Sequence, residues 1–287
     1  PDRVLKNFKP EMDKAETSFS VDGRKLKPVE VAKLFYSHVK DQIEESTGQK
    51  AERAVITVPA FFGDVGYQVF KRGAEEAGLK VERILREPAS AAVGYAINNP
   101  LSSHETVLVY DWGGGTFDVS LLDVREENGS PKFNILRNEG RTDLGGRDLD
   151  RLILEKVFVE RFVKEHGEDP TDEPEVRAEW LKRAEDIKKG LSENDSEVDF
   201  IQGKQKQLSV ELTRNDFDKL IKPLVDETID ITKKLLEETS KSKSDIDRLV
   251  LVGGTTRIPY IKSKISKFVG LEPERGVDPD LAVVTGA

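Results

Sequence analysis

Two apolar, β-branched runs separated by three consecutive glycines place the strongest constraint on how this chain folds. Residues 107–124 read VLVYDWGGGTFDVSLLDV, and a further β-rich run extends through Phe133 to Leu136. Apolar runs joined by a tight glycine turn are typical of β-hairpins. We therefore expect a hairpin here, with the large Trp112 side chain used for packing.

The glycine turn also has a composition that suits an anion. Gly113, Gly114 and Gly115 lack a β-carbon, so their backbone N–H groups can approach a phosphate closely. Asp111 precedes the glycines and Asp118 follows them, and such carboxylates can hold a metal ion through water. A flexible hairpin turn would explain the glycines alone. The acids and Thr116 at fixed offsets favour a phosphate site.

A second glycine turn lies near the end of the chain, where Gly253-Gly254-Thr255-Thr256-Arg257 follows a short apolar run at 249–252. A helix with apolar residues at helical spacing is expected after it, from Pro259 to Gly270. Backbone donors and the positive end of the helix would then face the same space. A simple strand-to-helix connector explains the same residues. Neither turn matches the P-loop or the dinucleotide-binding fingerprint.

The rest of the chain alternates between helical and β-type patterns. Helices are predicted over 28–47, 68–77, 148–165 and 173–191, and strands over 54–62, 197–201 and 207–212. Pro28 suits a first helical turn, and Gly48 and Gly78 suit helix ends. Thr213 and Asp216 predict a capping box for a long last helix, which Pro223 should kink or divide. Hairpins mixed with strand-to-helix units indicate an α/β fold with mixed sheets.

Composition excludes several classes of protein. The chain has 287 residues, a net charge of −9 and no cysteine. A disulfide scaffold, a thiolate-ligated metal centre and a cysteine nucleophile are therefore impossible. The acidic balance argues against nucleic-acid binding, and no apolar stretch is long enough for a membrane helix. We expect a cytoplasmic protein with two domains, or one large two-lobed unit.

Six segments occur together in a fixed order. They are AVITVPAFF (54–62), REPASAAVGYAI (86–97), VYDWGGGTFDVS (109–120), LGGRDLD (144–150), LVLVGGTTRIP (249–259) and VDPDLAVVTGA (277–287). These closely resemble the successive motifs of the nucleotide-binding domain of the seventy-kilodalton heat-shock chaperones, DnaK type. The resemblance implies the actin-like ATPase (ribonuclease H-like) fold, with two lobes around a nucleotide. It places the first lobe at 1–100, without the family's N-terminal phosphate-binding hairpin, and the second at 101–287, with 145–222 as an inserted nucleotide-contacting subdomain.

The same resemblance implies roles for individual residues. Glu87 matches the acid near the nucleophilic water, and Lys9 matches the lysine that contacts the transferring phosphate. Asp111 and Asp118 match the acids that organise magnesium, potassium and water, and Thr116 belongs to the phosphate loop with the three glycines. The remaining predicted nucleotide contacts are Gly145, Gly146, Glu185, Lys188, Lys189, Ser192, Gly253, Gly254, Thr255, Arg257 and Asp280.

The implied function is binding and hydrolysis of ATP, coupled to peptide binding in a domain that this sequence does not contain. The implied ligands are ATP, ADP, Mg²⁺ and K⁺. The implied partners are a J-domain co-chaperone, a nucleotide-exchange factor and, through the other domain, unfolded client peptides in a stress response. A hydrolysis-deficient interaction or exchange module and a sugar-kinase-type phosphotransferase are the alternatives.

Four positions depart from the family pattern. Lys189 replaces the usual adenine-stacking arginine, which removes a planar guanidinium surface. Arg147 stands where members usually carry an acid, and Arg86 replaces the common asparagine before Glu-Pro. Tyr67 occupies the place of an arginine linked to interdomain signalling. We therefore expect a divergent member with weak nucleotide binding.

Overall fold

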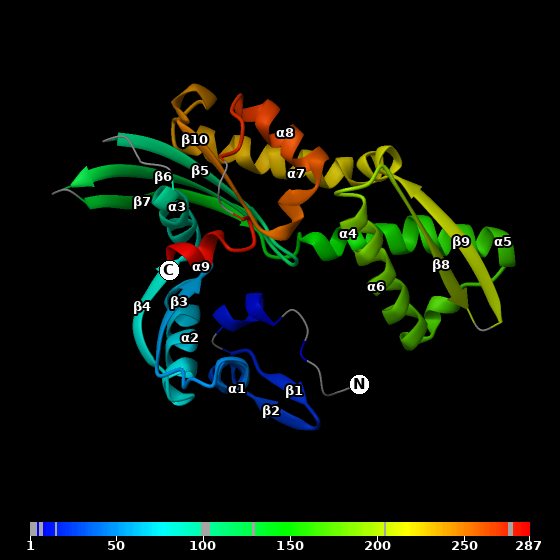
Figure 1. The fold of residues 1–287 in the computed structure, drawn as a ribbon, viewed down its shortest axis with the longest axis horizontal. Helices are drawn as coiled ribbons and strands as arrows, with labels where there is room; N and C mark the ends of the chain where they lie inside the picture. Colours follow the sequence, from blue (N-terminus) through cyan, green and yellow to red (C-terminus); the bar gives the residue numbers. More distant parts are fainter. Residues whose placement is uncertain are drawn as a thin grey trace. The chain divides into compact units, whose positions relative to one another are not determined.

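The chain folds into two units, each built from helices and strands (Figure 1). The computed structural model describes residues 5, 8–14, 16–98, 104–127, 130–203, 205–274 and 278–287. By its contacts, the first unit comprises Pro1–His104, Leu122–Asn138 and Gly276–Ala287, and the second comprises Glu105–Leu121 and Glu139–Arg275. The division falls within a sheet whose strand order is β10-β5-β6-β7.

The first unit contains a parallel pair of strands. β3 (Arg53–Val58) pairs with β4 (Lys80–Arg86), and α2 (Asp64–Glu76) connects them. α1 (Pro28–Thr47) packs on α2 so closely that a β-carbon on Gly73 would lie 2.4 Å from the Ala32 side chain. The core of this unit consists of Met12, Val31, Ala32, Tyr36, Ile56, Val58, Phe62, Val69, Phe70, Ala74 and Leu79.

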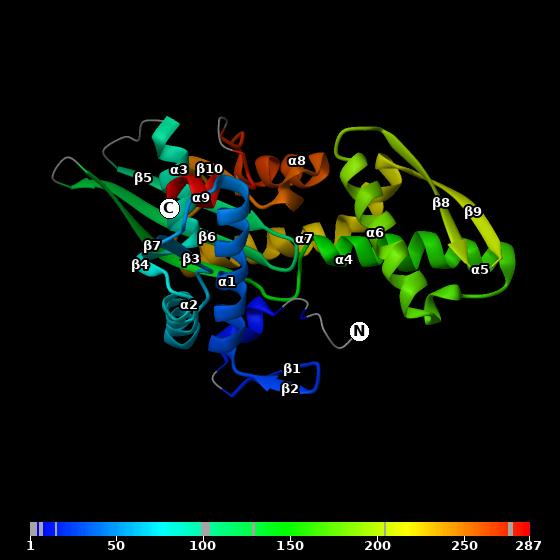
Figure 2. The ribbon, with the colours of Figure 1, turned by 60° about the horizontal axis from the view of Figure 1, so that its bottom comes forward.

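Most of the predictions for this unit are confirmed, and two are incomplete. α1 has the predicted bounds and ends at Gly48, whose φ is 68°. β3 ends at Val58, so the strand predicted over 54–62 closes at Pro59, and α2 begins at Asp64, four residues before the predicted start. The sequence did not predict β4, nor the hairpin of β1 (Phe19–Val21) and β2 (Arg24–Leu26) beside α1 (Figure 2). These three strands are short or rich in charged residues, so their strand conformation could be recognised only from their pairing.

Two helices of the first unit cross at very short range. α3 (Glu87–Asn98) packs on α9 (Ala282–Gly286), which lies within the motif at 277–287. A β-carbon on Gly94 would lie 2.5 Å from the Ala282 carbonyl oxygen, and one on Gly286 would lie 1.8 Å from the Ser90 carbonyl oxygen. Glycine is therefore required at both positions by the approach of the two backbones.

The second unit contains the predicted glycine hairpin. β5 (His104–Trp112), β6 (Phe117–Glu127) and β7 (Ser130–Arg141) are neighbours in one sheet, of which Leu122–Asn138 is assigned to the first unit, and β10 (Arg248–Val252) pairs in parallel with β5. The Trp112 side chain is fully buried and contacts Tyr110 and Phe117 edge to face, which confirms that it packs. Parallel and antiparallel pairs therefore occur together, and the prediction of an α/β fold with mixed sheets is confirmed.

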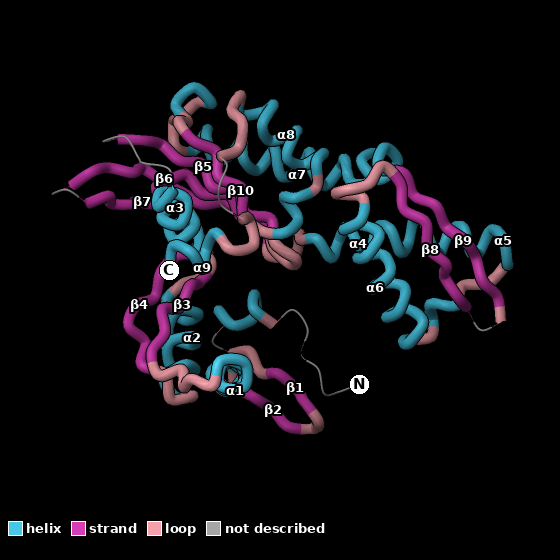
Figure 3. Tube along the Cα trace, in the orientation of Figure 1, coloured by secondary structure: helices cyan, strands magenta, loops and turns pink. Residues whose placement is uncertain are grey.

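A helical region with its own hairpin continues the second unit (Figure 3). It contains α4 (Gly146–Ile153), α5 (Glu160–His166), α6 (Pro174–Gly190), β8 (Ser196–Gly203) and β9 (Lys206–Thr213). The predicted single helix over 148–165 includes a π-helical segment, Leu154–Val159. The hairpin packs on α6, where the Trp180 indole donates to the Gln202 carbonyl oxygen at 3.0 Å.

Two long helices complete the second unit, α7 (Arg214–Glu238) and α8 (Pro259–Val269). Thr213 accepts a hydrogen bond from the Asp216 amide, which confirms the predicted start of α7. Pro223 does not divide α7, because buried side chains on either side of it, including Ile221 and Val225, hold the helix against the core. No helix in the described part of the chain combines the length and apolarity needed to cross a bilayer.

Candidate functional site

The first glycine turn links the ends of β5 and β6 in the second unit. The Gly113 amide donates to the Thr116 carbonyl oxygen at 3.0 Å, which closes the turn. A β-carbon on Gly114 would meet no atom within 4 Å, and one on Gly113 would come no closer than 3.9 Å. Among the described residues, the amides of Gly114 and Gly115 donate to no protein acceptor. The Gly114 amide is therefore an open backbone donor beside empty space, as an anion site requires.

The glycine pair at 145–146 packs directly against this turn. The Gly146 amide donates to the Gly113 carbonyl oxygen at 2.9 Å, and the Arg147 amide donates to that of Gly114 at 3.0 Å. A β-carbon on Gly145 would lie 2.3 Å from the Gly115 nitrogen. The pair begins α4, whose first turn is capped by Asp148 accepting from the Gly145 amide at 2.7 Å. These glycines thus serve close packing, whereas Gly114 does not.

The second glycine turn joins the same cluster because β10 lies beside β5, with Val252 opposite Asp111. The Thr255 hydroxyl donates to the Gly113 carbonyl oxygen at 3.0 Å. Gly253 has φ of 83°, and a β-carbon there would lie 2.5 Å from the Trp112 carbonyl oxygen. A short 3-10 helix, Gly254–Arg257, separates this turn from α8, so the α8 amino terminus does not follow the glycines directly.

α6 adds a buried cation to the cluster. The Lys188 ammonium lies 2.7 Å from the Asp150 carboxylate and donates to the Gly146 carbonyl oxygen at 3.0 Å. Both side chains are buried, and burial raises the pKa of the Asp150 carboxyl although Lys188 opposes the shift. The sequence did not single out Asp150, because it lies 38 positions before Lys188 and only the packing of α4 on α6 brings them together.

The other predicted residues of α6 lie near its carboxyl end. Glu185 and Lys189 form an ion pair at 2.7 Å, one helical turn apart. The hydrogen bond from Lys189 lowers the pKa of the Glu185 carboxyl. The Ser192 hydroxyl lies 3.5 Å from the Lys188 carbonyl oxygen. Lys189 is exposed, unlike the buried Lys188.

Asp111 and Asp118 flank the first turn on β5 and β6, and both are partly exposed. β7 passes close to the second acid, because a β-carbon on Gly140 would lie 3.0 Å from the Asp118 Oδ1 atom. Within the described residues, no group of three or more histidine, aspartate or glutamate side chains is arranged to hold a metal ion. A cation at these two acids would therefore need water or phosphate oxygens to complete its coordination.

Three predicted residues belong to the first unit. The Lys9 ammonium donates to the Glu87 carboxylate at 2.6 Å, where Glu87 is the first residue of α3. Asp280 is exposed, and its amide donates to the Asp278 carboxylate at 3.0 Å. Asn7, which the resemblance aligns beside Lys9, lies outside the described residues.

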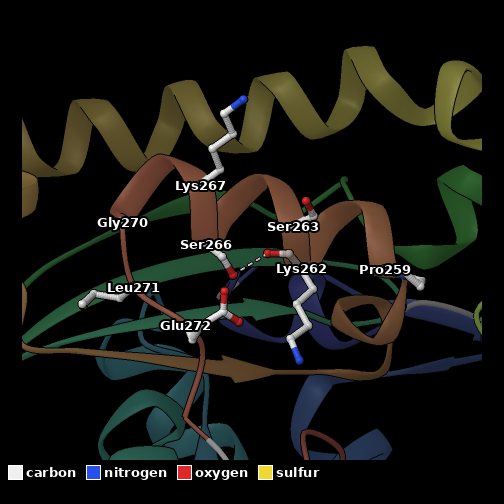
Figure 4. A pocket seen from close by; sticks show the side chains of 8 residues that line it. All are labelled: Pro259, Lys262, Ser263, Ser266, Lys267, Gly270, Leu271 and Glu272. Carbon is white, nitrogen blue, oxygen red and sulfur yellow. Dashed lines mark hydrogen bonds between the residues drawn. The ribbon is translucent and has the colours of Figure 1, made fainter.

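A separate groove follows α8 (Figure 4). Its lining residues are Pro259, Lys262, Ser263, Ser266, Lys267, Gly270, Leu271 and Glu272. The Ser266 hydroxyl is already engaged, since it donates to the Lys262 carbonyl oxygen at 2.7 Å. No residue predicted from the sequence for the site lines this groove, so it is distinct from the glycine cluster.

One comparison identifies the family. The family model described as Hsp70 protein matches residues 5–287, which is nearly the whole chain. Its members bind and hydrolyse ATP, and neither a sugar kinase nor a hydrolysis-deficient module is favoured by the match. This chain therefore belongs to the Hsp70 family and carries the ATP-binding domain of a chaperone, with the actin-like ATPase fold.

Proposed function

We propose that the glycine cluster of the second unit is the place where this chain holds the phosphates of ATP and ADP. The observation that supports this most directly is the contrast between the glycines. Gly145 and Gly146 are needed for packing, whereas Gly114 faces open space and has no positive φ. A glycine that neither packing nor backbone strain requires is best explained by the approach of a ligand to its amide.

The residues around the turn fit a nucleotide with magnesium. Asp111 and Asp118 would hold Mg²⁺ through water, and the ion would neutralise phosphate charge. Gly253, Gly254, Thr255 and Arg257 would contact the adenosine, and Glu185, Lys189 and Ser192 would line the ribose and adenine side. Lys188 is assigned to support Gly146, because its ammonium is already shared between Asp150 and that carbonyl.

Lys9 and Glu87 are proposed to serve the transfer of the γ-phosphoryl group to water. Phosphoryl transfer depends mainly on positioning and charge stabilisation. Lys9 would neutralise developing charge, and Glu87 would orient the attacking water or accept its proton. Their ion pair supports this pairing of roles, since each holds the other's charge until nucleotide is present.

Other properties that the resemblance to the family implies are also proposed for this chain. Asp280 would contact nucleotide from its own segment, K⁺ would accompany Mg²⁺, and lobes at 1–100 and 101–287 would close on the ligand, with 145–222 as the inserted subdomain. A J-domain co-chaperone and a nucleotide-exchange factor would set the cycle in the cytoplasm during a stress response. Client peptides would bind through a domain outside this sequence.

Two measurements test the proposal. Titration calorimetry with Mg-ATP on folded chain should give a saturable heat, and a flat titration would contradict the binding site. Single-turnover hydrolysis should then fall by about 100-fold in Glu87→Gln. Glu75→Gln is the matched control, because Glu75 lies on the surface of α2 in an ordinary helical pair with Lys71. Equal rates in both variants would remove Glu87 from the chemistry.

A further inference from the structure

Lys9 and Glu87 are held by more than their own ion pair. Lys9 is the first residue of a 3-10 helix, Lys9–Asp13, and Glu87 begins α3 directly after β4. Each of these segments is tied to the same stretch of chain, residues 59–66, which runs from the end of β3 into α2.

Asp13 fixes the helix that carries Lys9. Its carboxylate accepts from the Gly63 amide at 3.0 Å and from the Gly66 amide at 2.6 Å, at the start of α2. The Met12 side chain beside it is fully buried. Because Lys9 lies only four positions before Asp13, this anchor restricts where the Lys9 ammonium can lie.

Arg86 fixes the start of α3, the helix that carries Glu87. Its guanidinium Nη1 donates to the carbonyl oxygens of Pro59 at 3.1 Å and Ala60 at 3.4 Å, and also to that of Phe62. Arg86 immediately precedes Glu87, so the hold on the loop is also a hold on the first turn of α3. This is the residue that departs from the asparagine common in the family.

Gly66 completes a closed set of contacts. A β-carbon there would lie 2.7 Å from the Asp13 Oδ1 atom and 2.5 Å from the Phe62 ring. On one side, the segment that carries Lys9 is bound through Asp13 to Gly66. On the other side, the segment that carries Glu87 is bound through Arg86 to Phe62 in the same loop. The ion pair between Lys9 and Glu87 closes the set.

We infer that Asp13 and Arg86 are positioning residues, which set the separation of Lys9 and Glu87 by clamping residues 59–66 between them. Neither side chain needs to contact nucleotide. The inference deepens the proposed function, because it rests on Lys9 and Glu87 acting in hydrolysis. It predicts a loss in the chemical step with unchanged nucleotide binding, since the proposed phosphate cradle belongs to the second unit.

Hydrolysis gives the first test. Asp13→Ala should lower the single-turnover rate by about 10- to 100-fold, the cost of a displacement near 1 Å, with the calorimetric affinity for Mg-ATP unchanged. Asp13→Asn should recover part of the rate, because its amide oxygen can accept from both amides that Oδ1 now serves, whereas the Nδ2 group in place of Oδ2 cannot accept from Gly63. Asp41→Ala, on the exposed face of α1, is the control. A normal rate in Asp13→Ala, or no recovery in Asp13→Asn, would overturn the inference.

Chemical labelling gives a test that does not depend on hydrolysis. The acylation rate of the Lys9 amine should rise several-fold in Asp13→Ala and in Arg86→Met, as the ion pair with Glu87 loosens. Lys71 is the internal control, because its side-chain exposure is 41% against 46% for Lys9 and it also pairs with a glutamate. Unchanged Lys9 labelling in a folded variant would overturn the inference, and Arg86→Met decides the matter where Asp13→Ala does not fold.

The proposed role of Lys9 and Glu87 in hydrolysis and the proposed positioning role of Asp13 and Arg86 can be disproved separately. Where Lys9→Met and Glu87→Gln leave hydrolysis unchanged, the proposed function fails, while labelling of Lys9 still decides whether Asp13 and Arg86 position it. Where those variants lose hydrolysis and Asp13→Ala and Arg86→Met keep it, only the positioning role fails.

Discussion

The ammonium of Lys188 lies 2.7 Å from the carboxylate of Asp150, and both side chains are buried. The same ammonium donates to the Gly146 carbonyl oxygen, and the Gly146 amide donates to that of Gly113. A buried charge pair on two helices thus supports the glycine turns to which we assign the phosphates. Removing one partner leaves an uncompensated charge in the core.

Lys188→Met should therefore lower the free energy of unfolding by about 3–5 kcal/mol at neutral pH, measured by urea denaturation. The loss of stability caused by Lys188→Met should become smaller as the pH is lowered. Burial already raises the pKa of Asp150, and loss of Lys188 raises it further. The folded state then binds the proton more tightly than the unfolded state, so stability falls as pH rises above about 4, the ordinary pKa of an aspartate.

The control for this prediction is the double variant Lys188→Met/Asp150→Asn. It has no buried charge at either position, so the added pH dependence should disappear and part of the lost stability should return. Equal destabilisation by Lys188→Met at about pH 4.5 and about pH 7.5 would show that Asp150 does not titrate as the burial requires.

Gly114→Ala and Gly145→Ala should separate ligand binding from packing. Alanine at 114 meets no atom within 4 Å, so the melting temperature should stay within a degree or two of the parent's, while the affinity for Mg-ATP falls by about tenfold or more. Alanine at 145 would overlap the Gly115 nitrogen and should lower stability by about 1–3 kcal/mol. Full affinity in Gly114→Ala would argue against phosphate binding at this turn.

Gly253→Ala should cost more stability than Gly270→Ala. Both glycines have positive φ, 83° and 87°, so both substitutions incur backbone strain of about 1 kcal/mol or more. Only at 253 would the new β-carbon also overlap a neighbour, the Trp112 carbonyl oxygen, because 270 has open space around it. Denaturation curves of the two variants should differ by the cost of that overlap. Equal losses of stability in the two variants would mean that the backbones of β10 and β5 move apart near Gly253 at little energetic cost.

Lys189→Arg should strengthen ATP binding by about two- to fivefold, because an exposed guanidinium adds a planar surface for the adenine. The change keeps the positive charge and can keep the pair with Glu185. Lys189→Gln should show no gain, and neither variant should change the affinity for inorganic pyrophosphate. A gain for pyrophosphate as well would indicate a general charge effect in place of adenine stacking.

Secondary structure followed from the sequence wherever periodicity was long or a terminating residue was clear. α1 with Gly48, the strands around Gly113–Gly115 and α8 with Gly270 all have the expected positions. β4 was missed because its residues, KVERILR, lack an apolar alternation, and its strand conformation depends on pairing with β3. Pro223 was expected to interrupt a helix that tertiary packing holds continuous.

The residues of the candidate site, too, were predictable only in part from the sequence. The glycines and acids around 111–118 and 253–257 stood out because their chemistry is local, a few residues with the right backbone freedom and charge. Asp150 and Asp13 did not stand out, because an isolated acid in a charged sequence carries no signal of its partner. Arg86 stood out only as a departure from the family pattern, and its contacts could not be predicted. The contacts of these three side chains join residues 24 to 53 positions apart.

The sequence by itself therefore determined the fold class, the family and the two glycine turns. Only the tertiary structure decided that Gly145 and Gly146 close on Gly113–Gly115, and that the buried Lys188 contacts both Gly146 and Asp150. It also decided that the contacts of residues 59–66 hold Lys9 against Glu87. The physical reason is that local conformation depends on neighbouring residues, whereas the energy of a buried charge or a close backbone approach depends on whichever distant segment the fold brings beside it.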